Sequence, residues 1–160
     1  MFSENRTKYN PLSLFILLII LTPGILFSQG IPINVDQSGF VGMTLEDLIV
    51  NFGIPRSVYP VRGLEEWQDD VVFIYDEGDF YIYRDRVWQI GLESYMGIKT
   101  GDPGQIVPLM MNSVPGILRL DSRPGFYSFS IFNRSWPMIV RFDLDDEGEV
   151  RAIFIFRSDL

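Results

Sequence analysis

The sequence predicts an α+β fold made of two tandem helix-plus-antiparallel-meander repeats, with the sheet covered on one face by the helices. A short stretch with helical periodicity lies between turn signals at residues 42–44 and 53–55, and alternating aromatic strands follow it to residue 92. A looser version of the same order runs from residue 97 to residue 156. We therefore divide the chain into a signal peptide (1–28), a linker (29–39), a first repeat (40–94) and a second repeat (95–160).

Residues 1–28 have the composition of an export signal. Arg6 and Lys8 form a basic start, and Leu14–Leu21 is an unbroken apolar run. The small side chain of Ser28 suits a cleavage site, so we expect an exported product that begins near Gln29 and is periplasmic or extracellular. The alternative is an uncleaved membrane anchor, although a spanning helix needs about 20 apolar residues and this run is shorter.

The first repeat opens with a predicted helix over Leu45–Phe52. Thr44 stands where an N-cap belongs, because its hydroxyl can accept a hydrogen bond from an amide of the first turn. Acidic side chains at residues 46 and 47 complement the helix dipole, and Gly53 supplies a C-terminal stop. Four period-2 runs separated by polar turns then predict an antiparallel meander: Ser57–Val61, Trp67–Tyr75, Phe80–Tyr83 and Val87–Leu92.

The second repeat follows the same plan less regularly. Pro108 would remove a hydrogen bond inside a helix, so we place this helix from about Val107 to Asn112. Residues 87–90 and 150–153 fall at the same place in the two repeats, each directly after a polar turn. The strands predicted for the second meander are Gly116–Leu120, Phe126–Phe132, Pro137–Leu144 and Glu149–Phe156.

Composition excludes several kinds of chemistry. The 160 residues include no cysteine and no histidine, which removes disulfides, thiolate nucleophiles, Cys or His metal sites and any histidine base. The net charge is −8 and Lys99 is the only lysine after Lys8, so the basic stripe needed for nucleic-acid binding is missing. We expect no cofactor and no metal. The acidity is interpreted as a source of solubility, with steering of a basic partner as the alternative.

The acidic segment near residue 145 imitates the start of a calcium loop. Asp143, Asp145, Glu147 and Gly148 have the alternate spacing of such a loop. Its twelfth position should hold a bidentate glutamate, and Phe154 stands there instead. We therefore predict a polar hairpin turn.

The turn motifs of the first repeat resemble those of a known family. Gly42–Thr44 and Gly53–Pro55, followed by an aromatic strand, a polar turn and Arg86–Ile90, are similar to the repeat of the β-lactamase inhibitor proteins and to the small outer-membrane β-barrel assembly lipoproteins. The pattern returns at Gly97–Asp102, so the resemblance covers nearly everything after Gly39. It implies a helix packed on an antiparallel sheet, two units side by side, and a sheet surface that binds protein. The chain has neither the disulfides of the inhibitors nor the lipidated cysteine of the lipoproteins, so β-lactamase inhibition is not implied.

The first meander is apolar on both faces, which suggests a binding surface. Tyr81 and Tyr83 share one face of their strand, and Trp88 alternates along the next strand together with Ile90 and Leu92. A single helix covers only one face, and Tyr and Trp are typical of protein-binding surfaces. We predict Tyr81, Tyr83 and Trp88 as protein-binding residues. The alternative is that this face packs against the other repeat, a linker or a second copy of the chain.

These observations predict an exported, non-catalytic protein-binding module with a protein partner in the envelope or outside the cell. It would touch a membrane only through an uncleaved signal segment. The first alternative is a small-ligand carrier with a groove between the repeats. The second is a carboxylate-dependent hydrolase, which needs two acidic side chains that converge in a pocket. The side chains predicted to line the carrier groove are Phe73, Tyr75, Phe129 and Phe142.

Overall fold

The computed structural model describes residues 36–62, 70–132 and 134–160. The predicted signal peptide, residues 29–35 of the predicted linker and the first residues of the strand predicted over Trp67–Tyr75 lie outside the described residues. The described residues belong to one compact unit, which extends from Asn34 to Leu160. It begins with a short 3₁₀ helix, η1 (Gln37–Phe40), so the last residues of the predicted linker are helical.

Helix α2 (Leu45–Phe52) has the bounds that the sequence predicts. The Thr44 hydroxyl accepts a hydrogen bond from the Asp47 backbone N–H at 3.0 Å, and the Asp47 carboxylate accepts one from the Thr44 N–H at 2.9 Å. This capping box satisfies two donors at the helix start. The Thr44 hydroxyl also donates to the Asp47 carboxylate at 2.8 Å, and the bonds from the Thr44 N–H and then from this hydroxyl hold the pKa of Asp47 below its ordinary value. Gly53 ends the helix at a φ of +79°.

Four strands follow α2, as predicted, and form a meander. Between the third and fourth strands, Arg84 and Asp85 form a two-residue loop with φ values of 48° and 64°. Positive φ at both loop residues matches the twist of a tight hairpin. The third strand starts earlier than predicted because Gly78 pairs with Tyr75. The strands are β1 (Ser57–Val61), β2 (Asp70–Tyr75), β3 (Gly78–Tyr83) and β4 (Arg86–Leu92).

A small hairpin that the sequence reading missed precedes the second helix. It consists of β5 (Ser94–Tyr95) and β6 (Ile98–Lys99). Helix α3 (Ile106–Met111) then tolerates Pro108, because this residue lies in the first turn, where backbone N–H groups have no partner within the helix. The second meander is β7 (Ile117–Arg123), β8 (Phe126–Ile131), β9 (Met138–Leu144) and β10 (Val150–Arg157).

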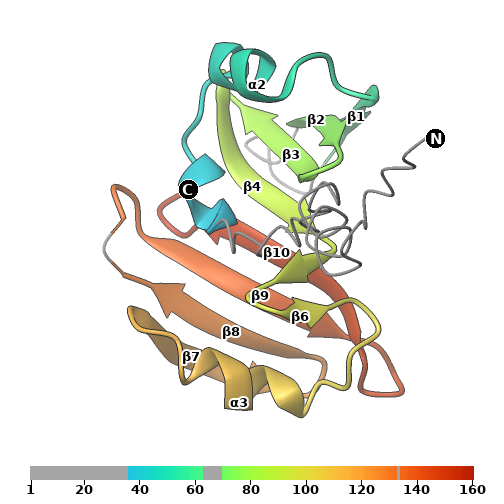
Figure 1. Cartoon of the computed structure of the whole chain (residues 1–160), viewed down its shortest axis with the longest axis vertical. Helices are drawn as coiled ribbons and strands as arrows, with labels where there is room; N and C mark the ends of the chain where they lie inside the picture. The colour runs from blue at the N-terminus through green and yellow to red at the C-terminus, as the bar shows by residue number, and fades with distance from the viewer. Residues whose placement is uncertain (1–35, 63–69, 133) are drawn as a thin grey trace, which may run out of the picture. The chain divides into compact units, whose positions relative to one another are not determined.

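The two meanders join edge to edge in one antiparallel sheet, which confirms the α+β class. The strand order is β1-β2-β3-β4-β10-β9-β8-β7, so the last strand of each meander pairs with the last strand of the other (Figure 1). Ile155 of β10 lies opposite Ile90 of β4 at this junction. Helix α3 packs near β7 and β8.

One sheet face and both helices share a single hydrophobic core. Phe80 pairs with Ile90, and Ile90 with Ile155, and all three side chains are fully buried. Leu48 of α2 and Met111 of α3 belong to the same buried cluster. Each such side chain contributes roughly 1.5–3 kcal/mol when fully buried. The described helices therefore cover one face of the sheet.

The loop between β8 and β9 is fastened to the segment that precedes α2. Arg134 forms an ion pair with Asp36 and donates from Nε to the Ser38 hydroxyl oxygen at 2.9 Å. Trp136 packs so closely on Gly42 that a Cβ added to this glycine would overlap the indole nitrogen. These contacts tie the second meander to the first outside the sheet itself.

Candidate functional site

The sheet face opposite the shared core is called the helix-free face, because the helices α2 and α3 pack on the other side. Its centre lies on β4, β10 and β9. Gln89 pairs with Phe156, and Phe156 pairs with Ile139 across these strands. These positions alternate along their strands with fully buried core residues, so their side chains point away from the core.

A second cross-strand row on this face is built around a glycine. Phe154 lies between Gly91 on β4 and Arg141 on β9. A Cβ added at Gly91 would be 3.5 Å from the Phe154 ring, so the missing side chain leaves the ring room to lie over β4. The row therefore places a half-buried ring at the junction of the two meanders.

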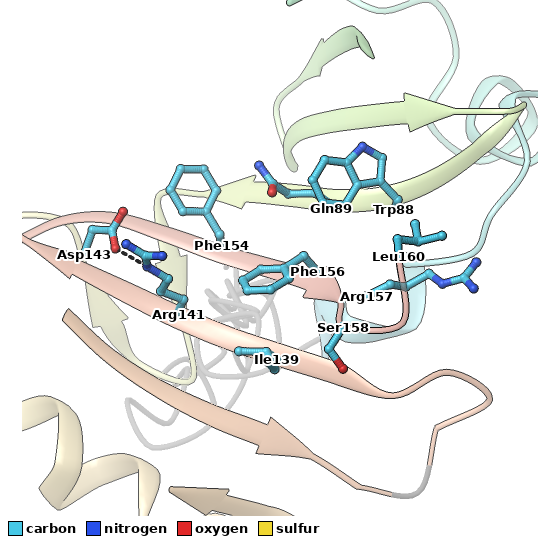
Figure 2. A pocket seen from close by; sticks show the side chains of 10 residues that line it. All are labelled: Trp88, Gln89, Ile139, Arg141, Asp143, Phe154, Phe156, Arg157, Ser158 and Leu160. Atoms are coloured by element: carbon cyan, nitrogen blue, oxygen red, sulfur yellow. Dashed lines mark hydrogen bonds and ion pairs between the residues drawn. The ribbon is translucent and has the colours of Figure 1, made fainter. Parts of the chain in front are cut away.

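These rows form a depression of about 500 Å³, called the aromatic groove. A volume of this size lies within the range of small-molecule pockets. Aromatic rings occupy its middle, and Figure 2 shows charged side chains near both of its ends. Its lining residues are Trp88, Gln89, Ile139, Arg141, Asp143, Phe154, Phe156, Arg157, Ser158 and Leu160.

The charges at both ends of the aromatic groove are paired within the chain. At one end Arg141 Nε donates to Asp143 Oδ1 at 2.5 Å, and the guanidinium lies 4.4 Å from the centre of the Phe126 ring. At the other end Arg157 pairs with Asp159 at 2.8 Å, and its hydrogen bonds hold the pKa of Asp159 below the ordinary value. The groove therefore offers an apolar centre between two internally neutralised ends.

Next to the aromatic groove lies a second depression of about 520 Å³, called the acidic depression. Phe154 lines both, so the two depressions adjoin at this ring, and the second also reaches the core residues Tyr75, Leu92 and Ile153. Its charged lining consists of the four carboxylates of Asp76, Glu77, Asp79 and Glu93 and the two guanidinium groups of Arg56 and Arg151.

Asp79 and Glu93 both line the acidic depression: Asp79 lies opposite Gly91 in the β3–β4 pairing, and Glu93 follows two residues after Gly91. Partial burial, and then the nearby charge of Glu93, raise the pKa of Asp79 above its ordinary value. In the described part of the chain, neither carboxylate forms an ion pair or a side-chain hydrogen bond. Two carboxylates in one depression could bind a cation or act as an acid and a base.

The structure separates the three predicted binding residues. Trp88 lines the aromatic groove and Tyr81 lines the acidic depression, so both lie on or beside the helix-free face. Tyr83 lines a different depression next to the start of α2, together with Leu45 and Asp85. Two of the three predicted residues thus lie near one surface, and the third lies elsewhere.

Trp88 does not alternate with Ile90 and Leu92 in the way the sequence suggested. Tyr81 pairs with Gln89, whereas the next residue of β3, Ile82, pairs with Val87. Trp88 is the extra residue of this β-bulge and turns to the helix-free face, whereas Ile90 and Leu92 stay in the core. The prediction of a shared face was wrong because a bulge breaks the period of two.

The groove predicted between the repeats for a small ligand is not formed by the predicted residues. Phe129 and Phe142 are fully buried, Tyr75 is 6% exposed, and Phe73 packs against the same core. The meanders meet edge to edge, so these rings fill the space under the helices rather than a gap between two sheets.

The predicted hairpin turn after β9 is confirmed. The Asp145 carboxylate accepts a hydrogen bond from the Glu149 N–H at 2.8 Å, and the Asp145 N–H donates to the Glu149 carbonyl at 3.0 Å. Asp143, which the calcium-loop pattern would turn toward an ion, instead accepts from Arg141.

Sequence reasoning missed Phe154, Phe156 and Arg141 as site residues. The signal for the two phenylalanines was present, because apolar side chains in residues 150–156 occur at both odd and even positions. The first meander was recognised as apolar on both faces, and the same reading applied to β10 would have found these rings. Nothing local indicated that β10 pairs with β4.

Comparisons with known proteins give one structural similarity. No protein-family model and no curated protein sequence matches the chain. The structure is similar, with a TM-score of 0.48 and 11% sequence identity, to an extracellular protein containing an SCP domain from Bacillus anthracis str. Ames. The similarity covers 76% of this chain and 45% of that protein. This chain thus spans less than half of that protein, and no activity or partner is transferred from it.

The lengths and compositions of the described helices can be compared with what a membrane span requires. Across residues 36–62, 70–132 and 134–160, no helix is long and apolar enough to cross a bilayer.

Proposed function

We propose that this chain is an exported, non-catalytic protein-binding module of the cell envelope or secreted space, and that it binds its partner through the helix-free face. The observation that carries the proposal is the aromatic groove at the centre of the sheet. Phe154 and Phe156 are half-buried there, whereas the core on the opposite face is complete without them. Aromatic side chains placed outside the core are typical of protein-binding surfaces.

The chemistry of the groove supports a macromolecular partner. Interfaces commonly combine an apolar centre rich in aromatic residues and arginine with a polar rim. Here Trp88 and the two phenylalanine rings provide the centre, and the Arg141–Asp143 and Arg157–Asp159 pairs provide the rim. Paired charges can remain in place when a partner covers them, because they already satisfy each other.

The internal order of the chain supports the proposed duplication. A helix followed by four antiparallel strands occurs first as α2 with β1–β4 and again as α3 with β7–β10. The last strands of the two units pair with each other at the sheet centre. We propose that these are tandem repeats of the kind seen in the β-lactamase inhibitor proteins, and that the signal-like segment 1–28 directs export.

A binding role accounts better than hydrolysis for the Asp79 and Glu93 pair. A carboxyl group that acts as a general acid near neutral pH is held protonated by an enclosed apolar setting. Glu93 is exposed, and the depression that contains it is rich in polar groups. We therefore do not propose hydrolysis as the activity of this pair.

Site-specific photo-crosslinking in intact cells tests the binding face. A photoreactive phenylalanine analogue replaces Phe154 on the helix-free face in one variant, and Leu109 in a matched variant. Leu109 is 75% exposed on α3 and lies outside both depressions. We expect a discrete protein adduct from position 154 and none from position 109.

Two results would reject the proposed face. Adducts of equal yield at both positions would show that contact is unspecific, and adducts at position 109 alone would place the partner on the helix side. An adduct of twice the mass of the chain would identify a second copy as the occupant.

A further inference from the structure

The helix-free face has an apolar half and an acidic half that share one side chain. The aromatic groove and the acidic depression meet at Phe154. The ion pairs at the ends of the groove leave it close to neutral, so the charge of the face comes mainly from the acidic depression. A partner that covers the whole face meets a ring cluster and an acidic cluster side by side.

The acidic half carries more negative charge than its own cations neutralise. Arg56 is engaged by Asp76 in an ion pair. Glu77, Asp79 and Glu93 form no ion pair within the described residues, and Arg151 is the other guanidinium of the lining. Carboxylates therefore outnumber cations there, in a chain whose net charge is already −8. Such a field attracts and orients cationic partners.

The closeness of Asp79 to Glu93 gives the cation a defined place. Asp79 is half-buried and lies opposite Gly91 in the β3–β4 pairing, and Glu93 follows two residues after Gly91, so both carboxylates line the acidic depression. The like charge of Glu93 acts on Asp79 there. A cationic group between them would relieve the repulsion and supply charge-assisted hydrogen bonds to both. The aliphatic stem of a lysine or arginine could then lie along the shared Phe154 ring, which also attracts its charge.

We propose that the helix-free face recognises a protein loop that carries a lysine or arginine next to a large apolar side chain. The cationic side chain binds between Asp79 and Glu93, and the apolar side chain enters the aromatic groove beside Trp88 and Phe156. This inference rests on the proposed function and adds the chemistry of the partner to it.

The test selects a library of disulfide-closed peptides, displayed on phage with six varied positions, against the purified protein. We expect the enriched peptides to combine a basic residue with an aromatic or large aliphatic residue. The double variant Asp79→Asn/Glu93→Gln loses the hydrogen bonds between charged groups. It should therefore bind a selected synthetic peptide about tenfold or more weakly than the parent does. Phe154→Ala should weaken the same peptide.

The matched control is Glu46→Gln/Asp85→Asn, which makes the same two chemical changes. Both side chains are exposed, and both lie outside the aromatic groove and the acidic depression. Asp85 has a φ of 64°, which asparagine adopts readily, so the backbone is preserved. The control should bind the peptide with unchanged affinity, and equal urea midpoints would show that all variants are folded.

The outcomes separate this inference from the proposed function. Peptides that need Phe154 but contain no basic residue, or that bind the Asp79→Asn/Glu93→Gln variant unchanged, would overturn the cationic partner and leave the binding face intact. Selected peptides that are insensitive to Phe154→Ala, together with no adduct from position 154, would overturn both. If the control and the double variant lose the same affinity for the peptide, the effect comes from the overall charge of the protein. That result would reject Asp79 and Glu93 as the specific cation-binding pair.

Discussion

Replacing Gly42 by alanine should destabilise the fold far more than the same change at Gly53. Gly42 has a φ of +94°, and the Trp136 indole lies against its Cα. An added methyl group would overlap the indole nitrogen and approach two ring carbons to 3.2 and 3.3 Å. Gly53 has a similar φ of +79°, but an added Cβ there meets no atom within 4 Å.

The expected loss in the free energy of unfolding for Gly42→Ala is the sum of two separate terms. Alanine at positive φ costs about 1–2 kcal/mol, and this cost applies to both glycines. Displacing a packed ring costs about 1–3 kcal/mol more, and this cost applies only to Gly42. The backbone cannot easily move away, because the Gly42 N–H donates to the Val87 carbonyl at 2.8 Å and Arg86 donates to the Gly42 carbonyl at 2.9 Å. Gly42→Ala should therefore cost about 2–5 kcal/mol in total.

Urea unfolding followed by circular dichroism measures both variants. With a slope of about 1–3 kcal/mol per molar urea, Gly42→Ala should lower the midpoint by on the order of 1 M or more, and Gly53→Ala by clearly less. A double variant adds a further control: with Trp136→Leu present, Gly42→Ala should cost only about as much as Gly53→Ala. Equal losses for the two glycine variants would refute the reasoning, because they would show that the indole does not oppose a side chain at residue 42.

Two further predictions concern a helix cap and a buried phenol. Thr44→Ala should lower the free energy of unfolding by about 1 kcal/mol, measured in urea. The folded-state pKa of Asp47 lies below 3.8, so the parent loses the stability from this carboxylate as the pH falls below that value. The variant lacks the hydroxyl bond to Asp47 and should lose less stability over the same pH range. Burial raises the pKa of Tyr95 from 10.0 to about 12, so the folded protein holds the phenol proton more tightly than the unfolded chain does. The stability of the folded protein should therefore fall as the pH rises from 10.0 to about 12. Tyr95→Phe should flatten this alkaline fall, and an absorbance titration in which all tyrosines of the folded parent ionise near pH 10 would contradict the assignment.

The sequence predicted those parts of the fold that depend on near neighbours. Thr44, the acidic first turn and Gly53 defined α2 to the residue, because capping and dipole effects act within one turn. Alternation of apolar and polar residues located the strands of both meanders to within a few residues, since it reports which side chains enter the core. The β5–β6 hairpin was not predicted, because two-residue strands are too short to show the alternation that identifies a strand.

The candidate site depends on contacts that local patterns do not contain. The pairing of Phe154 with Gly91 joins residues from the two meanders, and nothing in either strand specifies it. The bulge at Trp88 is defined only against its partner strand, where Ile82 and Tyr81 keep their alternation and β4 does not. Residue types therefore predict a binding surface, and the pairing of the strands determines where the proposed surface lies.

The two sheet faces use aromatic residues in physically different ways, and this difference is the basis for proposing that one of them binds a partner. Phe129 and Phe142 meet edge to face at 6.2 Å and have no exposed surface, so their contribution to stability is already complete in the isolated chain. Phe154 and Phe156 lie on the other side of the sheet and keep part of their surface in water. That surface can contribute free energy only when something else covers it, and the carboxylates beside Phe154 favour a cationic group in whatever does so.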